Sequence, residues 1–119
     1  MHEMSIVQAL IEQVGSEVEK SGQRGRVVGL DLVVGRLSGV HADSVRFAFE
    51  LLAPGTMLDG AALHIAEPLA TSHCQICGVD TPVEELVMRC LACGSEQITI
   101  TGGQDLLLQT IELEDEETP

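Results

Sequence analysis

The sequence contains few aromatic residues. Among its 119 residues there is no tryptophan or tyrosine, and Phe47 and Phe49 are the only aromatic side chains. A hydrophobic core must therefore be built from aliphatic side chains, and in a chain of this length such a core is thin. This composition favours one small domain, or a small domain carrying a still smaller module that a metal ion stabilises.

Basic residues are also few. Six Lys and Arg residues stand against 19 Asp and Glu residues, which gives a formal net charge of −13. Binding to nucleic acid needs clustered basic side chains, but here they are mostly scattered and the pair Arg24 and Arg26 is too small to reverse the sign. We therefore expect no nucleic-acid partner. The acidic run from Glu112 to Glu117 is interpreted as a solvated, frayed terminus.

Long apolar runs and enzyme motifs are missing as well. No apolar stretch approaches the roughly 20 residues that cross a bilayer, and residues 1–20 contain four glutamates without the basic start of a secretory signal. The sequence has no phosphate-binding loop, no His-Glu-x-x-His motif and no nucleophile elbow. These absences predict a soluble, cytoplasmic protein that contacts no membrane and is not an enzyme.

Four cysteines form two Cys-x-x-Cys pairs, each followed by glycine: Cys74 with Cys77, and Cys90 with Cys93. Two intervening residues let a tight turn direct both sulfurs at one ion, and twelve residues separate the pairs. The spacing predicts a structural Zn²⁺ held by four thiolates. Two disulfides, a redox dithiol and a rubredoxin-like iron site are the rival interpretations, and a reducing cytosol disfavours the first.

Hydrophobic periodicity outlines the remaining elements. A helix is expected after Glu3, capped by Ser5 and ending at Gly22, with an apolar stripe at the spacing of helical turns. A strand with period two follows from Arg26, in which Val28, Leu30, Leu32 and Val34 are expected to share the apolar face.

A second helix is predicted after a loop at residues 35–39. It begins with Asp43 or Ser44 as its cap, ends at Pro54-Gly55, and carries Val45, Ala48, Phe49 and Leu52 on one face. Further strands are expected at Ala62–Ala66, at residues 97–101 and at residues 106–113.

The order of these elements predicts an α+β fold: a small sheet of about three strands with two helices, plus an inserted zinc-ribbon-like module with four cysteines. We expect residues 1–68 and 104–119 to form the α+β domain and residues 69–103 to form the zinc-binding module. Bends near Pro68 and Gly102-Gly103 would allow this module to move.

The amino terminus, Met1-His2-Glu3-Met4, is a second candidate metal site. An α-amine, the deprotonated amide nitrogen of His2 and its imidazole can close fused chelate rings around one ion. Planar nitrogen donors suit Ni²⁺ or Cu²⁺. Histidine is too large for efficient removal of the preceding methionine, so Met1 is expected to be retained. From the residues alone, a solvent-exposed end is the simpler interpretation.

Four stretches together resemble the hydrogenase-maturation nickel metallochaperones of the HypA/HybF family. They are the opening Met1–Ser5, the loop Gly35–Val40, the segment Phe47–Glu50, and the repeated Cys-x-x-Cys ending in Cys93-Gly94-Ser95. The resemblance runs over nearly the whole chain. It implies a nickel site at His2 with the amine of Met1 and Glu3 as accompanying donors, and a zinc site at the four cysteines.

The same resemblance implies partners. These are a nickel-insertion GTPase, the [NiFe]-hydrogenase large-subunit precursor that receives the nickel and, in some organisms, urease maturation proteins. Two positions depart from the family's pattern: Arg36 stands where glutamate is common, and His41 stands where an acidic residue is common. His41 is either a replacement nickel donor or a surface residue. His64 and His73 are interpreted as surface histidines rather than metal ligands.

The alternative function is a zinc-ribbon adaptor that mediates protein assembly without nickel delivery. That interpretation leaves the His2-Glu3 opening unexplained, whereas a nickel metallochaperone accounts for it.

Overall fold

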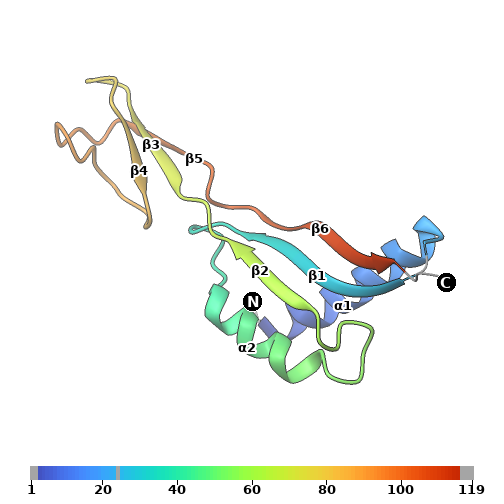
Figure 1. Cartoon of the computed structure of the whole chain (residues 1–119). Helices are drawn as coiled ribbons and strands as arrows, with labels where there is room; N and C mark the ends of the chain where they lie inside the picture. The colour runs from blue at the N-terminus through green and yellow to red at the C-terminus, as the bar shows by residue number, and fades with distance from the viewer. Residues whose placement is uncertain (1–2, 24, 116–119) are drawn as a thin grey trace.

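The computed structural model describes residues 3–23 and 25–115 (Figure 1). In chain order its elements are α1 (Glu3–Ser21), β1 (Gly25–Val34), α2 (Ala42–Leu52), β2 (Ala62–Ala66), β3 (Ala70–Cys74), β4 (Asp80–Val83), β5 (Ile98–Thr101) and β6 (Leu106–Asp115). None of the helices in this described part is both long and apolar enough to cross a membrane. The element order confirms the predicted α+β fold.

The body of the molecule (residues 3–23, 25–66 and 106–115) is a sheet of order β2-β1-β6 with both helices on one face (Figure 1). β1 pairs with β2 in parallel and with β6 antiparallel. The helices face this sheet because their apolar side chains recur once per turn. Buried side chains from both helices, β1 and nearby loops form the aliphatic core: Val7, Leu10, Val14, Val27, Leu30, Leu32, Val34, Val40, Val45, Ala48, Phe49, Ala53 and Leu58.

An irregularity in β1 corrects the predicted apolar face. Leu30, Leu32 and Val34 are buried as expected, but at the start of the strand Val27 is buried at 2% exposure and Val28 is only half-buried. The register passes from Val27 paired with Leu113 to Gly29 paired with Glu112, which leaves Val28 as an extra residue. Such a bulge switches the face on which all preceding side chains lie.

Both predicted helix caps are wrong by a few residues. α1 already begins at Glu3, so Ser5 lies inside its first turn and cannot be the N-cap. α2 begins at Ala42 with His41 at the N-cap position, so neither Asp43 nor Ser44 serves as its cap. The amphipathic pattern located both helices, whereas the exact first residue depends on how the preceding chain enters the fold.

The cysteine module (residues 70–101, from β3 to β5) is inserted between β2 and β6 and contains a second sheet of order β4-β3-β5. β3 pairs antiparallel with both neighbours. Strands β3 and β4 were not predicted, because their sequences are mostly polar. β4 contains Pro82, which is tolerated there because β4 is an edge strand. The module extends away from the body, so the molecule is elongated, with extents of 63 × 28 × 19 Å (Figure 1).

Candidate metal centre

Two similar turns bring the four cysteines together. Cys74 ends β3, and Gly78 donates its backbone N–H to the Cys74 carbonyl over 3.0 Å. In the second turn Gly94 donates to the Cys90 carbonyl over 2.9 Å. Gly78 and Gly94 have φ of +75° and +79°, a conformation that disfavours any side chain, and an added Cβ would meet no neighbour at either position. Glycine is therefore required here for backbone conformation and not for space.

The sulfur positions fit one tetrahedral ion. All four Sγ atoms lie within 4.8 Å of one another. Cys74 Sγ lies 3.6 Å from Cys93 Sγ, and Cys77 Sγ lies 3.7 Å from Cys90 Sγ. Tetrahedral zinc with bonds of about 2.3 Å separates its sulfur ligands by about 3.8 Å. No disulfide links the cysteines, so the predicted grouping is confirmed and the disulfide interpretation is not supported.

Backbone N–H groups polarise one sulfur in each turn. Cys74 Sγ accepts from the N–H groups of Ile76 and Cys77, each over 3.4 Å. The Cys77 N–H is the main reason that the pKa of the Cys74 thiol is lowered to about 6, with the second N–H assisting against the effect of burial. The equivalent Cys90 Sγ accepts from the next two N–H groups of its own turn, and its pKa is also lowered, chiefly by the N–H of Cys93.

The other two thiols titrate in the opposite direction. The N–H of Val79 lowers the pKa of Cys77, but burial and the neighbouring sulfurs outweigh it and raise the pKa to about 12. The N–H of Ser95 likewise lowers the pKa of Cys93, yet the Cys74 sulfur and burial raise it overall. The cluster thus combines two thiols of lowered pKa with two of raised pKa. A divalent ion would replace the remaining thiol protons on binding.

Burial differs between the two cysteines of each turn. Cys74 and Cys90 are 1% and 5% exposed, whereas Cys77 and Cys93 are exposed. Four thiolates in this compact arrangement complete a tetrahedral shell, so no coordination position remains for a substrate or water. The donor set therefore suits a structural ion. A bound ion would hold the two turns together.

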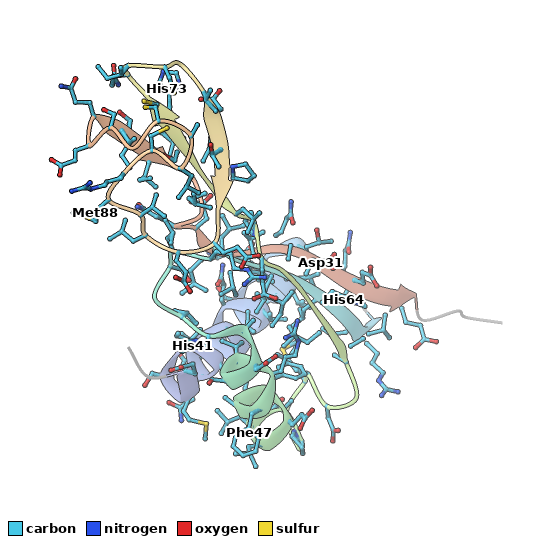
Figure 2. All side chains as sticks on the ribbon, turned by 90° about the vertical axis from the view of Figure 1, so that its left-hand side faces the viewer. Asp31, His41, Phe47, His64, His73 and Met88 are labelled. Atoms are coloured by element: carbon cyan, nitrogen blue, oxygen red, sulfur yellow. The ribbon has the colours of Figure 1, made fainter. Side chains whose placement is uncertain are left out.

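Only part of the proposed nickel site lies within the described residues. Met1 and His2 lie outside the described residues. Glu3 is half-buried and opens α1, which packs against α2. His41 is exposed at the start of α2, as Figure 2 shows, and lines a cleft of about 670 Å³ between α2 and the cysteine module.

The remaining histidines are on the surface. His64 on β2 is exposed and is the register neighbour of Asp31 on β1; both lie on the sheet face away from the helices (Figure 2). His73 is exposed, and its Nδ1 lies 2.6 Å from Asp80 Oδ1, because the two residues are directly opposite on β3 and β4. This pairing was missed in the sequence because the hairpin itself was not predicted.

The four cysteines are the single cluster of at least three possible metal-binding side chains in the described ranges. A family model described as "Hydrogenase/urease nickel incorporation, metallochaperone, hypA" matches residues 1–113. The chain belongs to the HypA family. HypA proteins are nickel metallochaperones of hydrogenase maturation, so the family resemblance seen in the sequence is confirmed.

Individual HypA relatives match this chain over nearly its full length. The hydrogenase maturation factor HypA of Chlorobaculum tepidum is 40% identical over 114 residues, covering 96% of this chain and 100% of the relative. The factor of the same name from Polaromonas naphthalenivorans is 37% identical over 116 residues, covering 98% and 100%. Because the matches cover nearly all of each chain, the body and the cysteine module both belong to the family's common architecture.

A solved structure supports the fold. The solution structure of the Ni metallochaperone HypA from Helicobacter pylori superposes with a TM-score of 0.63 at 24% identity, covering 98% of this chain and 100% of that chain. A second solution structure of a HypA protein gives a TM-score of 0.65 at the same identity, covering 98% of both chains. The two-helix body with its inserted module is thus a fold with experimental counterparts.

Proposed function

We propose that this protein binds Ni²⁺ at its amino terminus and delivers it to the [NiFe]-hydrogenase large-subunit precursor. The observation that carries the proposal is the family match over residues 1–113, which includes both the His2 opening and the four cysteines. The cysteine geometry supports separate roles for the two metal sites, because a closed tetrathiolate shell is unsuited to transferring its ion.

Zinc is the proposed resident ion of the cysteine module, bound by Cys74, Cys77, Cys90 and Cys93. Two of the sulfur separations match a zinc tetrahedron, and the lowered pKa values of Cys74 and Cys90 favour the thiolate form that binds zinc. We accordingly propose two domains: residues 69–103 as the zinc-binding module and residues 1–68 with 104–119 as the nickel-binding domain.

The proposed nickel donors are the α-amine of Met1, the amide and imidazole nitrogens of His2, and Glu3. Nitrogen donors in a plane suit Ni²⁺, and Glu3 at the start of α1 can add a carboxylate oxygen. A site made by a chain terminus has few rigid supports, so a partner can compete for its donors without unfolding the core. Protonation of the imidazole or the amide loosens nickel as the pH falls.

Proposed partners are the nickel-insertion GTPase of the maturation system and the hydrogenase precursor, with urease maturation proteins as further partners in some organisms. The cysteine module offers exposed apolar side chains for such contacts: Leu86 is 69% and Met88 is 76% exposed. Exposing two large apolar side chains within one loop is unfavourable unless a partner covers them. Nucleotide hydrolysis then belongs to the partner, and this protein acts without catalysis of its own, in the cytoplasm, where thiols stay reduced.

The test is metal content and nickel titration of the untagged protein beside a variant with residues added before Met1. We expect one zinc and one nickel per chain in the untagged protein, and loss of nickel alone in the extended variant, because the extension removes the terminal amine. Zinc alone in both proteins would instead favour the adaptor function.

A single substitution refines this test. His2→Ala is expected to abolish nickel binding in the titration while zinc content and the circular dichroism spectrum stay unchanged. His64→Ala is a matched control, because His64 is an exposed histidine of β2 on the sheet face away from the helices. Unfolding of the His2→Ala variant would contradict the separation between the nickel site and the fold.

A further inference from the structure

Two chain segments connect the cysteine module to the body, and both meet the same loop. One segment runs from β2 through Pro68 to β3, and the other runs from β5 through Gly103 to β6. The loop at residues 35–39 follows β1 directly and lies between them. It therefore contacts both connections at the only place where the chain passes between module and body.

Three backbone hydrogen bonds join this loop to the two connections. Arg36 donates its N–H to the Pro68 carbonyl over 3.0 Å, which holds the first connection. Leu37 donates to the Gly103 carbonyl over 2.6 Å, and Gly35 donates to the Asp105 carbonyl over 2.8 Å, which together hold the second. Consecutive N–H groups of one loop thus bind both connections at once.

Two glycines make the close approach possible. A Cβ on Gly35 would lie 2.2 Å from the Gly103 carbonyl oxygen, and a Cβ on Gly103 would lie 2.9 Å from both the backbone nitrogen and the Cβ of Ala70. These neighbours are backbone or short side-chain atoms that cannot rotate away. Gly35, Gly103 and Ala70 are all buried, so the crossing is packed without space for an extra methyl group.

The loop continues directly into the cleft beside α2. Val40 donates its N–H to Ser38 Oγ over 3.2 Å, and His41 then occupies the N-cap position of α2. Glu84 and Glu85 of the cysteine module line the same cleft as His41. The position of the module relative to the start of α2 is therefore determined at the crossing.

We infer that residues 35–37 form a backbone clasp that fixes the orientation of the cysteine module relative to the body. The bends at Pro68 and Gly102-Gly103 do not act as free hinges while these three hydrogen bonds are intact. Module and body behave as one rigid unit, and opening the clasp lets the module turn away from α2. Gly35 and Gly103 are positioning residues in this arrangement, and the inference does not depend on bound nickel.

The experiment measures residual dipolar couplings of backbone amides in the full-length, zinc-loaded protein. In the unmodified protein, a single alignment tensor is expected to fit the amides of the β2-β1-β6 sheet and those of β3 and β5 together. In Gly35→Ala, each group is expected to need its own tensor, because the added methyl group displaces the Gly103 carbonyl. Hydrogen exchange at the Leu37 amide is expected to accelerate at least about tenfold in the same variant.

Gly29→Ala is the matched control on the same strand. The one close approach of its Cβ would be to the carboxylate end of Glu112, at 2.7 Å, which can rotate aside, while the Glu112 Cβ would lie at an ordinary contact distance of 3.5 Å. This variant is expected to keep the single tensor. Gly102→Ala is a control for backbone strain within the second connection. Gly102 has a φ of +75°, close to the +71° of Gly103, but the nearest neighbour of an added Cβ would be the Leu69 carbonyl oxygen at 3.9 Å.

Two results would overturn the inference. In the first, the unmodified protein needs a separate alignment tensor for each part, which shows that the module already moves freely. This measurement is informative even if Gly35→Ala does not fold. The other is an unchanged single tensor and unchanged Leu37 exchange in a folded Gly35→Ala variant. Neither result bears on nickel binding, so the proposed function is tested separately by the titration above.

Discussion

At the residue scale, the four thiols have the same chemistry but different surroundings. The first cysteine of each pair receives two backbone N–H groups, whereas a single backbone N–H lowers the pKa of the second. Because a thiolate benefits most from such donors, charge concentrates on Cys74 and Cys90 before any ion binds. The turn, not the residue type, decides which sulfur ionises first.

The difference in pKa between the two cysteines of each pair predicts how thiolate formation in the metal-free protein depends on pH. The pKa of Cys74 is lowered to about 6, so its thiolate is present at neutral pH and is lost as the pH falls through that value. Thiolate absorbance in the ultraviolet is expected to rise in a first step near pH 6, and Cys74→Ser should weaken that step. Cys93→Ser is the control, since the pKa of Cys93 is raised. A single titration of all thiols near the ordinary value of about 8.5 would contradict this assignment.

The glycine that follows each cysteine pair leads to a second prediction. Gly94→Ala is expected to destabilise the zinc-loaded protein by roughly 1 kcal/mol, because alanine is strained at a φ of +79°. Thermal unfolding followed by circular dichroism measures this change. Ala92→Gly is the reverse substitution in the same turn, at a residue whose φ is not positive. In the described chain only glycines have a positive φ. An unchanged stability of Gly94→Ala would argue against a conformational role of this glycine.

At the scale of elements, α2 contains both aromatic residues of the chain in opposite environments. Phe49 is 7% exposed within the aliphatic core, whereas Phe47, two residues earlier, is 62% exposed and is seen on the outer side of the helix in Figure 2. Helical geometry places residues two apart on different faces. Only one of the two therefore contributes to the folding of the body.

Substitution of each phenylalanine tests this difference. Phe49→Ala is expected to lower the free energy of unfolding by about 3–5 kcal/mol, because it leaves a cavity in the core. Phe47→Ala is expected to change it by no more than about 0.5 kcal/mol. Chemical denaturation of both variants gives the comparison. A large loss in Phe47→Ala would mean that its side chain is covered, for example in an oligomer.

At the scale of the whole molecule, the body and the cysteine module are stabilised in different ways. The connected hydrophobic core consists of residues of the body alone. The buried residues of the module, Ala70, Ser72, Cys74, Val83 and Cys90, are few and include two of the proposed ligands. So small a core offsets little of the conformational entropy of ordering the module, and the ion supplies much of the module's stability.

Removal of the ion should therefore affect the two parts unequally. Chelation of zinc is expected to lower hydrogen-exchange protection in β3, β4 and β5 far more than in α1, α2 and β1. The helical circular dichroism signal should persist, because both helices belong to the body. Loss of protection throughout the chain would show that the body cannot fold without the metal.

How far the sequence predicts this structure depends on the element. Helices α1 and α2 and strands β2 and β6 were located closely, because apolar residues recur at the period of each element and burial follows that period. Strands β3 and β4 were missed, because their residues are mostly polar and their pairing is stabilised within the cysteine module. The helix caps and the face of Val27 were wrong, because the bulge and the chain entry depend on distant partners.

The sequence by itself determined the grouping of the four cysteines, the charge and the family. Cysteine spacing and the apolar stripes are local patterns, and local chemistry is sufficient to interpret them, whereas the nickel donors at His2 and Glu3 stay a prediction. The tertiary structure alone decided which sulfurs neighbour each other and how His73 pairs with Asp80. It also decided how residues 35–37 clasp the two connections to the module. These features depend on backbone segments far apart in the chain that meet only after folding, so no local pattern records them.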